Sequence, residues 1–391
     1  MVNLKSLPHP PQNALKQAGW DWALGTDTAP YVVNDMVVVT EQQAESYYEA
    51  AGTLYDMLVE AGQYAIDNTL FREMGIPENL VDLIKLSWND DRQIHLYGRF
   101  DLAGGFDEEP VKLIEFNADT ATCIPETAVV QWAHLRMNGM DESKQFNTLF
   151  ETLVGQFVYL KEENNDLTPS MLFSAMRGYP EDDTNVAVLM EAAKEAGFDV
   201  EFAYIDDVEF SNGEGIFYQE PEHGRFVRFD FWFKLVPWEN IGTDEPELAG
   251  MLTEIVKNRK AVILNPAYTL LFQSKYILKI LWDLYPYHPL LLQTDREPLP
   301  HKRSVSKVML GREGANVTIH GEDGEVQETA AGEYGDQARI YQEYTLLPTD
   351  PDGRTYQAGV FYAGEACALG FRRGGKILDN TAQFVGHIVD E

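Results

Sequence analysis

The sequence predicts a protein that mixes the α+β and α/β classes, and three observations lead to that expectation. Residues 39–96 place apolar side chains largely at helical spacing. Between residues 171 and 205 a strand, a helix and a strand follow one another, in the order that favours a parallel βαβ unit. Residues 263–391 carry one helix and then short β-type runs split by Gly, Asp and Asn.

The first elements expected along the chain are a helix and a β-hairpin. The segment EQQAESYYEAAGTLYDMLVEAG (41–62) has helical spacing, and its final Gly62 suits the position just after a last helical turn. YGRFDLAGGFDEEPVKLIEF (97–116) contains two strand-like runs around a Gly-rich acidic turn, which predicts a β-hairpin. A helix is expected next at IPETAVVQWAHLRMNG, ending near Gly139.

The middle and last parts of the chain continue this pattern. MLFSAM (171–176) and FDVEFAYI (198–205) are strand-like, and EDDTNVAVLMEAAKEAG between them is helical, so we expect a small open α/β lobe. TLLFQSKYILKILWDLYP (269–286) predicts one strong helix before the short β runs.

A chain of 391 residues is too long for one compact core, so several packed units that share faces are expected. The expected division covers the whole of 1–391. Its sub-regions are the N-terminal helices with the hairpin (1–165), the small α/β lobe (166–262) and the C-terminal part (263–391).

The charge balance argues against some partners. The 63 acidic against 30 basic residues give a net charge of −33, which repels nucleic acids and anionic membrane surfaces. Two readings of this charge stay open: an acidic surface that keeps the protein soluble, and attraction of a cationic substrate. The N-terminal segment lacks the apolar core of a signal peptide, and the apolar stretch around Ile277 is broken by Lys275 and Lys279. A cytoplasmic protein without a membrane span is therefore expected.

Polar side chains stand at alternate positions where an apolar run ends, in KLIEFNADTATCIPE (112–126). Glu115 and Asn117 are expected on one face of a strand, and Asp101 reaches that face if the preceding strand is antiparallel. Two carboxylates and a carboxamide oxygen suit Mg²⁺, which fills its other positions with water and phosphate. Arg99 shares the face and could clamp a phosphoryl group. The alternative is a polar strand end with ordinary turn-forming Asn and Asp.

A glycine-rich loop follows a strand in SVSKVMLGREGANV (304–317). Lys307 lies in the strand, and Gly311 and Gly314 would let a phosphate approach the backbone amides closely. Neither a Walker A nor a GxGxxG motif is present, and a Gly-rich turn between strands is the ordinary alternative. Lys275 could flank the same phosphates from the predicted helix, although lone lysines usually face solvent.

A third segment, IYQEYTLLP (340–348), reads as a strand. Its backbone could pair with the edge of an adenine, but such a strand is equally suited to a core. Its spacing leaves both readings open.

At these residues the sequence resembles the synthetase domain of glutathionylspermidine synthase and its single-domain relatives, the ATP-grasp acid–amine ligases. The matching stretches occur in the family's order and cover nearly the whole chain. They are RFD with EFNADTAT, VVQWAHL, SKYILKILWDLYPYHPLLL, GREGANV, YQEYTLLP, GEACALGFRR and ILDNTAQFVGHIV. The resemblance implies an ATP-grasp ligase fold with a small Rossmann-like (pre-ATP-grasp) α/β lobe. It makes 166–262 the substrate lobe and 263–391 the nucleotide-binding part.

The resemblance also implies roles for individual residues. Arg99 and Arg372 match arginines that steady the transferring phosphoryl group, and Thr120 falls where the family touches its glutathione-like substrate. A pair of Mg²⁺ ions is expected. The residues that match the magnesium ligands are Asp101, Glu115 and Asn117. The residues that match the ATP-binding positions are Lys275, Lys307, Glu313, Gly314, Gln342, Glu343, Tyr344 and Thr345.

The sequence departs from the family's pattern in places. Val308 stands where the family often has proline, and residues 172–177, where the family contacts its peptide substrate, match poorly. Bifunctional members carry an N-terminal cysteine amidase domain that has no counterpart in this sequence. Cys123 with the nearby His134 is the candidate for such chemistry here, and the alternative is a buried thiol without a catalytic role.

The implied function is ATP-dependent carboxylate–amine ligation. ATP would phosphorylate a carboxylate to an acyl phosphate, and an amine would attack it to give an amide, ADP and phosphate. The expected substrates are a glutathione-like peptide and a polyamine such as spermidine, and Asp379 is a candidate for the group that deprotonates the amine. A ligase with other acid and amine substrates, and a catalytically silent nucleotide-binding protein, remain as alternatives. The oligomeric state stays open.

Overall fold

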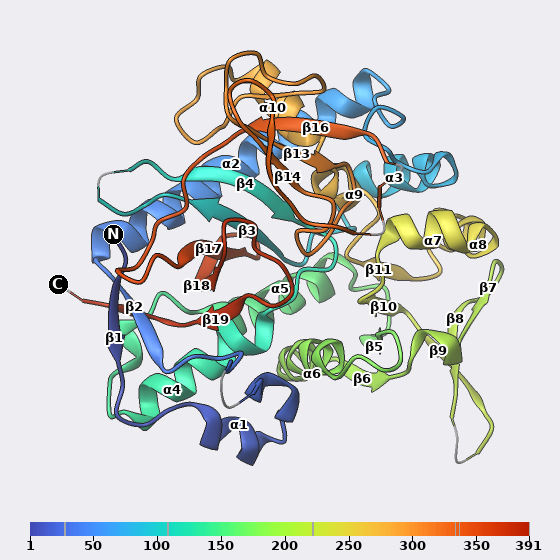
Figure 1. Ribbon diagram of the computed structural model, residues 1–391. Coiled ribbons are helices and arrows are strands. Elements are labelled where there is room, and N and C mark those ends of the chain that lie inside the picture. Colours follow the sequence, from blue (N-terminus) through green and yellow to red (C-terminus); the bar gives the residue numbers. More distant parts are fainter. Residues whose placement is uncertain (27–28, 108, 221–222, 333, 336, 391) are drawn as a thin grey trace.

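The computed structural model describes residues 1–391 except 27–28, 108, 221–222, 333, 336 and 391, and an antiparallel sheet lies at its centre (Figure 1). The strand order in this sheet is β19-β18-β17-β3-β4. Its strands are β3 (Gly98–Ala103), β4 (Lys112–Asn117), β17 (Thr355–Tyr362), β18 (Ala366–Gly374) and β19 (Gln383–Val385). The hairpin predicted for residues 97–116 is confirmed as β3 and β4. Because β3 pairs with β17, segments far apart in the sequence share one sheet.

A second sheet is parallel, with the strand order β11-β10-β5-β6. Its strands and crossover helix are β5 (Ser170–Ser174), α6 (Pro180–Glu195), β6 (Asp199–Phe202), β10 (Phe231–Lys234) and β11 (Val262–Leu264). The βαβ unit predicted between residues 171 and 205 is confirmed. The chain adds β6 on one side of β5 and later β10 on the other, so the strand order reverses between β5 and β10. Open parallel sheets bind ligands at such a switch point, beyond the carboxyl ends of the strands.

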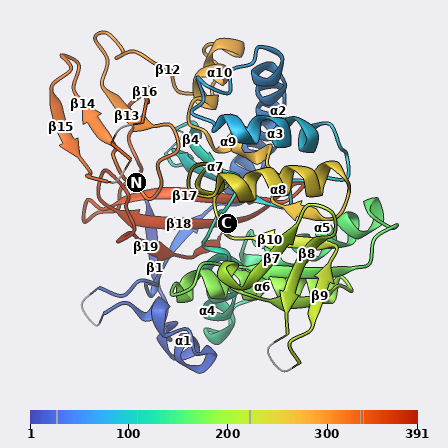
Figure 2. The same cartoon turned by 90° about the vertical axis from the view of Figure 1, so that its right-hand side faces the viewer.

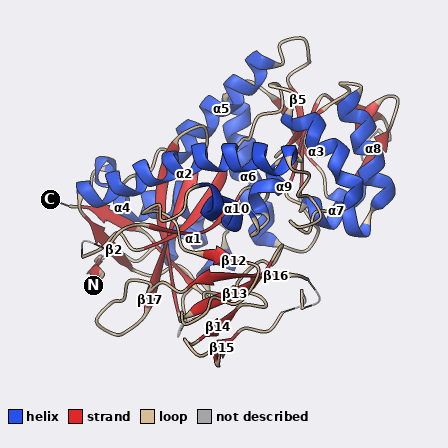
Figure 3. Ribbon diagram, turned by 90° about the horizontal axis from the view of Figure 1, so that it is seen from above, coloured by secondary structure: helices blue, strands red, loops and turns tan. Residues whose placement is uncertain are grey.

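A third sheet is antiparallel and has the strand order β12-β16-β13-β14-β15. Its strands are β12 (Thr294–Asp295), β13 (Ser304–Val308), β14 (Thr318–His320), β15 (Val326–Thr329) and β16 (Arg339–Glu343). These are the short β runs expected near the end of the chain. Figures 2 and 3 show this sheet and the parallel sheet on different sides of the molecule.

The long helix α2 (Glu41–Asp67) packs on β17 and β18 of the central sheet (Figure 3). The prediction that this helix ends at Gly62 is wrong, because the helix continues to Asp67. A Cβ atom at Gly62 would lie 2.8 Å from the ring of Trp88 and 3.0 Å from that of Phe272. The glycine therefore serves close packing between α2 and its neighbours, a tertiary requirement that local sequence does not reveal.

The single helix predicted for residues 269–286 is also wrong, because the structure has two helices there. They are α9 (Thr269–Gln273) and α10 (Ile277–Leu284). Between them Ser274 has an extended backbone with ψ of 122°, and its hydroxyl donates to the Met74 carbonyl at 2.7 Å. The Lys275 amide donates to the Met309 carbonyl at 2.9 Å. The break turns Lys275 towards the loop that follows β13.

The remaining elements complete the layers around these sheets. The remaining strands are β1 (Asn3–Ser6), β2 (Asp35–Val39), β7 (Val208–Ser211), β8 (Gly215–Gln219), β9 (Phe226–Phe229) and β20 (His387–Val389). The helices are α1 (Gln12–Ala18), α3 (Val81–Trp88), α4 (Gln131–Met137), α5 (Leu149–Glu163), α7 (Trp238–Asp244) and α8 (Pro246–Lys257). The helix predicted from residue 124 to Gly139 forms as a π-helical segment (Pro125–Val130) that continues into α4. Among the described residues, no helix has the length and apolar character needed to cross a membrane.

Candidate active site

A cavity of about 430 Å³ opens between the central sheet, the loop after β13 and the switch point of the parallel sheet. All the residues predicted to contact the metal, the nucleotide, the phosphoryl group or the acid line it, and residues as distant in sequence as Arg99 and Arg372 share its wall. Asp379, the candidate base, does not line it. The predicted residues in the lining are Arg99, Asp101, Glu115, Asn117, Thr120, Lys275, Lys307, Glu313, Gly314, Gln342, Glu343, Tyr344, Thr345 and Arg372.

The hairpin β3–β4 brings its polar side chains to one face. Arg99 stands opposite Asn117 and Asp101 opposite Glu115 in the antiparallel register. Asp101 is buried, accepts from Arg99 Nε at 2.7 Å and Nη2 at 3.2 Å, and accepts from Asn117 Nδ2 at 3.1 Å. Rotation of the Asn117 carboxamide by a half-turn would exchange the positions of Nδ2 and Oδ1, so that the oxygen could bind a cation.

The donor set of this face fits Mg²⁺. The described residues contain no group of three or more His, Cys, Asp or Glu side chains placed to hold a metal. Asp101, Glu115 and Asn117 instead offer carboxylate and carboxamide oxygens, all on the wall of one cavity. Magnesium usually takes one or two protein carboxylates and completes its shell with water and substrate phosphate. These few protein ligands are therefore suited to a Mg²⁺ ion that is also coordinated by a substrate phosphate.

Both predicted phosphate-binding lysines lie inside the protein rather than in solvent. Lys275 is 7% exposed; its ammonium lies 3.3 Å from Glu115 Oε2 and donates to the Gly311 carbonyl at 2.6 Å. Lys307 is 5% exposed and donates to Gln342 Oε1 at 2.8 Å. Burial lowers the pKa of Lys307 to about 8. Burial disfavours a charged Glu115, but the two lysines prevail and lower its pKa to about 2.

The glycine-rich loop is tied to the parallel lobe by a residue that the sequence reading passed over. Arg312 donates to Glu239 Oε1 from Nε at 3.1 Å and from Nη2 at 2.6 Å, and to the Thr120 hydroxyl at 2.6 Å. A Cβ at Gly314 would meet the Leu378 carbonyl at 2.4 Å, so this position needs glycine. The position of Arg312 inside the GREGAN segment was the available signal for its part in the site.

The end of β16 and the residues that follow it line the cavity. The Glu343 amide donates to the Gln293 carbonyl at 2.7 Å and the Tyr344 amide to the Arg303 carbonyl at 2.9 Å. Both amides are thus engaged within the protein. The Arg303 guanidinium also stacks 4.0 Å from the centre of the Tyr344 ring.

The switch point adds residues that the sequence reading did not select. Met176, Tyr179 and Asp182 follow β5, Leu235 follows β10, and all line the same cavity. Burial, followed by the charge of neighbouring Glu181, raises the pKa of Asp182 to about 6. Their place beyond the carboxyl ends of parallel strands was the signal that could have identified them.

Arg372 lines the cavity and is hydrogen-bonded to the backbone of Asp379. Arg372 Nη2 donates to the Asp379 carbonyl at 2.6 Å. The Asp379 carboxylate accepts from the Thr381 hydroxyl at 2.6 Å and from its amide at 2.9 Å, and these bonds lower its pKa. A carboxylate held in this way is a weak base, which argues against the expectation that Asp379 deprotonates an amine.

Cys123 fits the alternative of a buried thiol. Burial raises its pKa to about 12, which leaves it protonated at neutral pH. His134 Nε2 lies 3.2 Å from Asn34 Oδ1, and burial lowers its pKa to about 4. Neither side chain has the charge state or the partner that a cysteine nucleophile requires.

Glu126 is a fully buried carboxyl group in the π-helical segment before α4. Tyr31 donates its hydroxyl to Oε1 at 2.5 Å, whereas Oε2 has no partner among the described residues. Burial and the nearby charge of Glu181 raise the pKa of Glu126 to about 7. The folded protein therefore holds a proton there that an unfolded chain releases above the ordinary glutamate pKa of 4.5.

Glu126→Gln is expected to stabilise the protein increasingly as the pH rises. The wild type loses stability as the pH rises from the pKa of Glu126 in the unfolded chain to its pKa in the folded protein, because the folded protein must then bury an ionised carboxylate. The variant escapes a penalty of about 3 kcal/mol at about pH 8, at roughly 1.36 kcal/mol per pKa unit. Urea unfolding at about pH 5 and about pH 8 measures this. The same difference in unfolding free energy between variant and wild type at both pH values would contradict this expectation. The control is Glu162→Gln, at an exposed position.

The chain is similar to several known proteins. Residues 3–390 match the family model described as glutathionylspermidine synthase pre-ATP-grasp. A Haemophilus influenzae protein named "Putative acid–amine ligase" is 31% identical over 87% of this chain and 86% of its own length. The bifunctional glutathionylspermidine synthetase/amidase of Escherichia coli is 25% identical over 91% of this chain, which spans 58% of that relative. The glutathione synthetase-like effector of Globodera pallida has the same fold, with a TM-score of 0.53, 12% identity and coverage of 99% and 100% of the two chains.

Proposed function

The chain belongs to the glutathionylspermidine synthase pre-ATP-grasp family, with an ATP-grasp type of fold, and from this premise we propose which reaction its cavity performs. Its relatives are named as ligases, and the chain is an ATP-dependent C–N ligase. ATP phosphorylates a substrate carboxylate, and an amine attacks the acyl phosphate to give an amide, ADP and phosphate. The observation that carries this proposal is the convergence of carboxylate, amide, lysine and arginine side chains on one cavity.

Asp101, Glu115 and Asn117 are proposed to hold Mg²⁺, which we expect as two ions. When bound, magnesium would neutralise charge on the phosphoryl oxygens. Lys275 and Lys307 are proposed to take the phosphates. The ion pair of Lys275 with Glu115 supports this, because the lysine can instead bind a phosphate and the carboxylate a cation when both are present.

The arginines are proposed to act on the transferring group. Arg99 is neutralised by Asp101, so it serves mainly to orient that carboxylate and to line the phosphoryl site. Arg372 donates to a backbone carbonyl and lies on the same cavity. Fixed cations aimed at developing charge stabilise the transition state without reorganising.

Glu313, Gly314 and residues 342–345 are proposed to surround the rest of the nucleotide. Their place on the cavity wall supports this.

We propose a glutathione-like peptide as the acid, contacted by Thr120, and a polyamine such as spermidine as the amine. Asp182 and Glu313 on the cavity wall, together with the net charge of −33, favour a cationic amine. Deprotonating an alkylamine at neutral pH costs roughly 4–5 kcal/mol at a pKa near 10.4. Asp182, whose pKa burial raises to about 6, is better suited than Asp379 to accept that proton.

Release of ADP in the presence of ATP, Mg²⁺ and a panel of acids and amines tests the proposal. Release that needs both glutathione and a polyamine would support the substrates. Release with another pair would retain the ligase and replace the substrates. Tight ATP binding without release for any pair would overturn the ligase in favour of a silent nucleotide-binding protein.

A further inference from the structure

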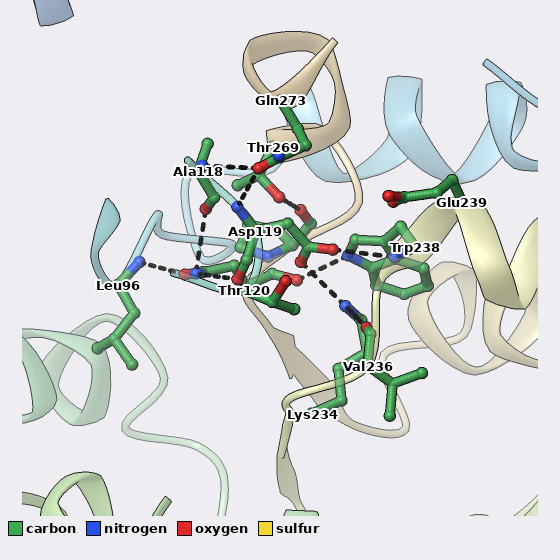
Figure 4. A network of polar contacts seen from close by, with 12 residues as sticks. Leu96, Ala118, Asp119, Thr120, Lys234, Val236, Trp238, Glu239, Thr269 and Gln273 are labelled. Atoms are coloured by element: carbon green, nitrogen blue, oxygen red, sulfur yellow. Dashed lines mark hydrogen bonds and ion pairs between the residues drawn. The ribbon is translucent and has the colours of Figure 1, made fainter. Parts of the chain in front are cut away.

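A fully buried ion pair, Asp119 with Lys234, links the segment after β4 to the end of β10 (Figure 4), and Thr120 and Leu235 next to it in the sequence line the cavity. Asp119 and Lys234 each have no exposed surface, and Lys234 Nζ lies 3.0 Å from Asp119 Oδ1. Asp119 comes two residues after Asn117 and one before Thr120. The pair therefore joins the proposed metal and substrate contacts to the switch point of the parallel sheet.

Both members of this pair make further hydrogen bonds to residues of the parallel lobe. Asp119 Oδ2 accepts from the Trp238 amide at 2.9 Å, and Lys234 Nζ donates to the Val236 carbonyl at 2.8 Å. The ammonium also lies 4.2 Å from the centre of the Trp238 ring. A buried charge with its partners satisfied in this way has a single favourable position, because any shift leaves an unpaired group in a medium of low dielectric.

The backbone beside Asp119 is held from other sides as well (Figure 4). Gln273 Oε1 accepts from the amides of Ala118 at 2.9 Å and Asp119 at 3.3 Å. Asn265 Nδ2 donates to the carbonyls of Ala118 at 3.2 Å and Asp119 at 2.8 Å. Gln273 ends α9, two residues before Lys275. The bend after β4 is therefore fixed relative to the break that places that lysine.

We propose that Lys234 is a positioning residue for the ligase reaction, acting through Asp119. The ion pair fixes the bend after β4 relative to the switch point. Asn117 and Thr120 then keep a fixed distance from a substrate that binds beyond the carboxyl ends of β5 and β10. This inference rests on the proposed function. Asn117 would hold Mg²⁺ and Thr120 would contact the acid, whereas Asp182 beyond β5 would accept the proton of the amine, so a displaced bend changes the distance between groups that must act together. Misplacement by about 1 Å can reduce a rate by about 10²-fold.

The test uses a variant that removes both charges, Asp119→Asn with Lys234→Met. Removing Lys234 alone leaves a buried carboxylate unpaired, whereas removing both charges avoids that destabilisation. The paired variant is expected to unfold close to the wild-type temperature but to lose kcat by about 10–100-fold, a loss typical of groups behind a metal ligand. The matched control is Arg228→Gln with Asp230→Asn, which breaks a 2.9 Å ion pair of the same lobe away from the bend.

Nucleotide binding supplies a readout besides turnover. Calorimetric ATP affinity of the paired variant is expected to equal the wild type in EDTA and to fall by about 10–100-fold relative to it in Mg²⁺. Wild-type kcat and Mg²⁺-dependent affinity in the paired variant would overturn the positioning role. A wild type that binds no ATP and releases no ADP would instead overturn the proposed function. Should the paired variant not fold, Asp119→Glu, which keeps both charges but displaces the carboxylate by one methylene, is measured in the same two assays.

Discussion

Asn117→Ala is expected to lower turnover by about 10²–10³-fold, the loss typical of removing one preorganised group from a charged transition state. Its cost in unfolding free energy is expected to be only about 1 kcal/mol. The side chain is half-buried, and its amide donates to Asp101 Oδ2 at 3.1 Å, so truncation removes a neutral donor and leaves the ion pair behind it in place. ADP release and urea unfolding of the same preparation measure the two effects.

Asp101→Ala serves as the contrast. Asp101 is the carboxylate partner of a buried guanidinium, that of Arg99, and removing it leaves an uncompensated charge. This variant is expected to lose turnover and about 3–5 kcal/mol of unfolding free energy together. Exposed Glu109→Gln, in the turn of the same hairpin, should retain both. A fall in stability of Asn117→Ala as large as that of Asp101→Ala would show that the amide is structural and would contradict the metal-ligand assignment.

The parts of the fold that follow from local periodicity were accessible from the sequence. The alternation around Glu115 and Asn117 predicted a strand with one polar face, and the strand–helix–strand order of 171–205 predicted parallel pairing. Both predictions depend only on the spacing of apolar and polar residues over a few positions. Gly62 and the break at Ser274 were misread because their causes lie elsewhere in the chain, in the rings of Trp88 and Phe272 and in the Met74 carbonyl.

The residues of the candidate site also fall into those that the sequence could predict and those that depend on tertiary packing. The ligand set predicted on the hairpin and the lysines from other segments do share one cavity, although spacing alone could not bring Lys275 and Glu115 to 3.3 Å. The family resemblance supplied that connection. Asp182 and Arg312 were missed because their place depends on the switch point and on contact with Glu239, which only the packed lobe creates.

Adjacent arginines on β18 give a matched comparison for the phosphoryl-transfer role. Arg372 and Arg373 pair with Gln357 and Tyr356 in the register and so point to opposite faces of the sheet. Arg373 lies 3.6 Å from Asp35 Oδ2 and donates to Gln383 Oε1. Arg372 lines the cavity, and among the described residues no carboxylate lies within ion-pair distance of it and its buried Nε has no partner.

Arg372→Met is therefore expected to reduce kcat by about 10³–10⁵-fold, the effect of losing an arginine that meets transition-state charge. Because that charge develops on the transferring group, ATP affinity in the absence of the acid should change by less than about tenfold. Arg373→Met should leave kcat unchanged and cost about 1.5–3 kcal/mol of stability, as for a largely buried cation that loses its hydrogen bonds. Single-turnover ADP formation separates chemistry from binding in both variants. Two outcomes would contradict this role of Arg372: an equal loss of kcat in both variants, or a normal rate of ADP formation in Arg372→Met. Another cation of the cavity would then have to stabilise the transition state, and Arg99 is a poor candidate because Asp101 already neutralises it.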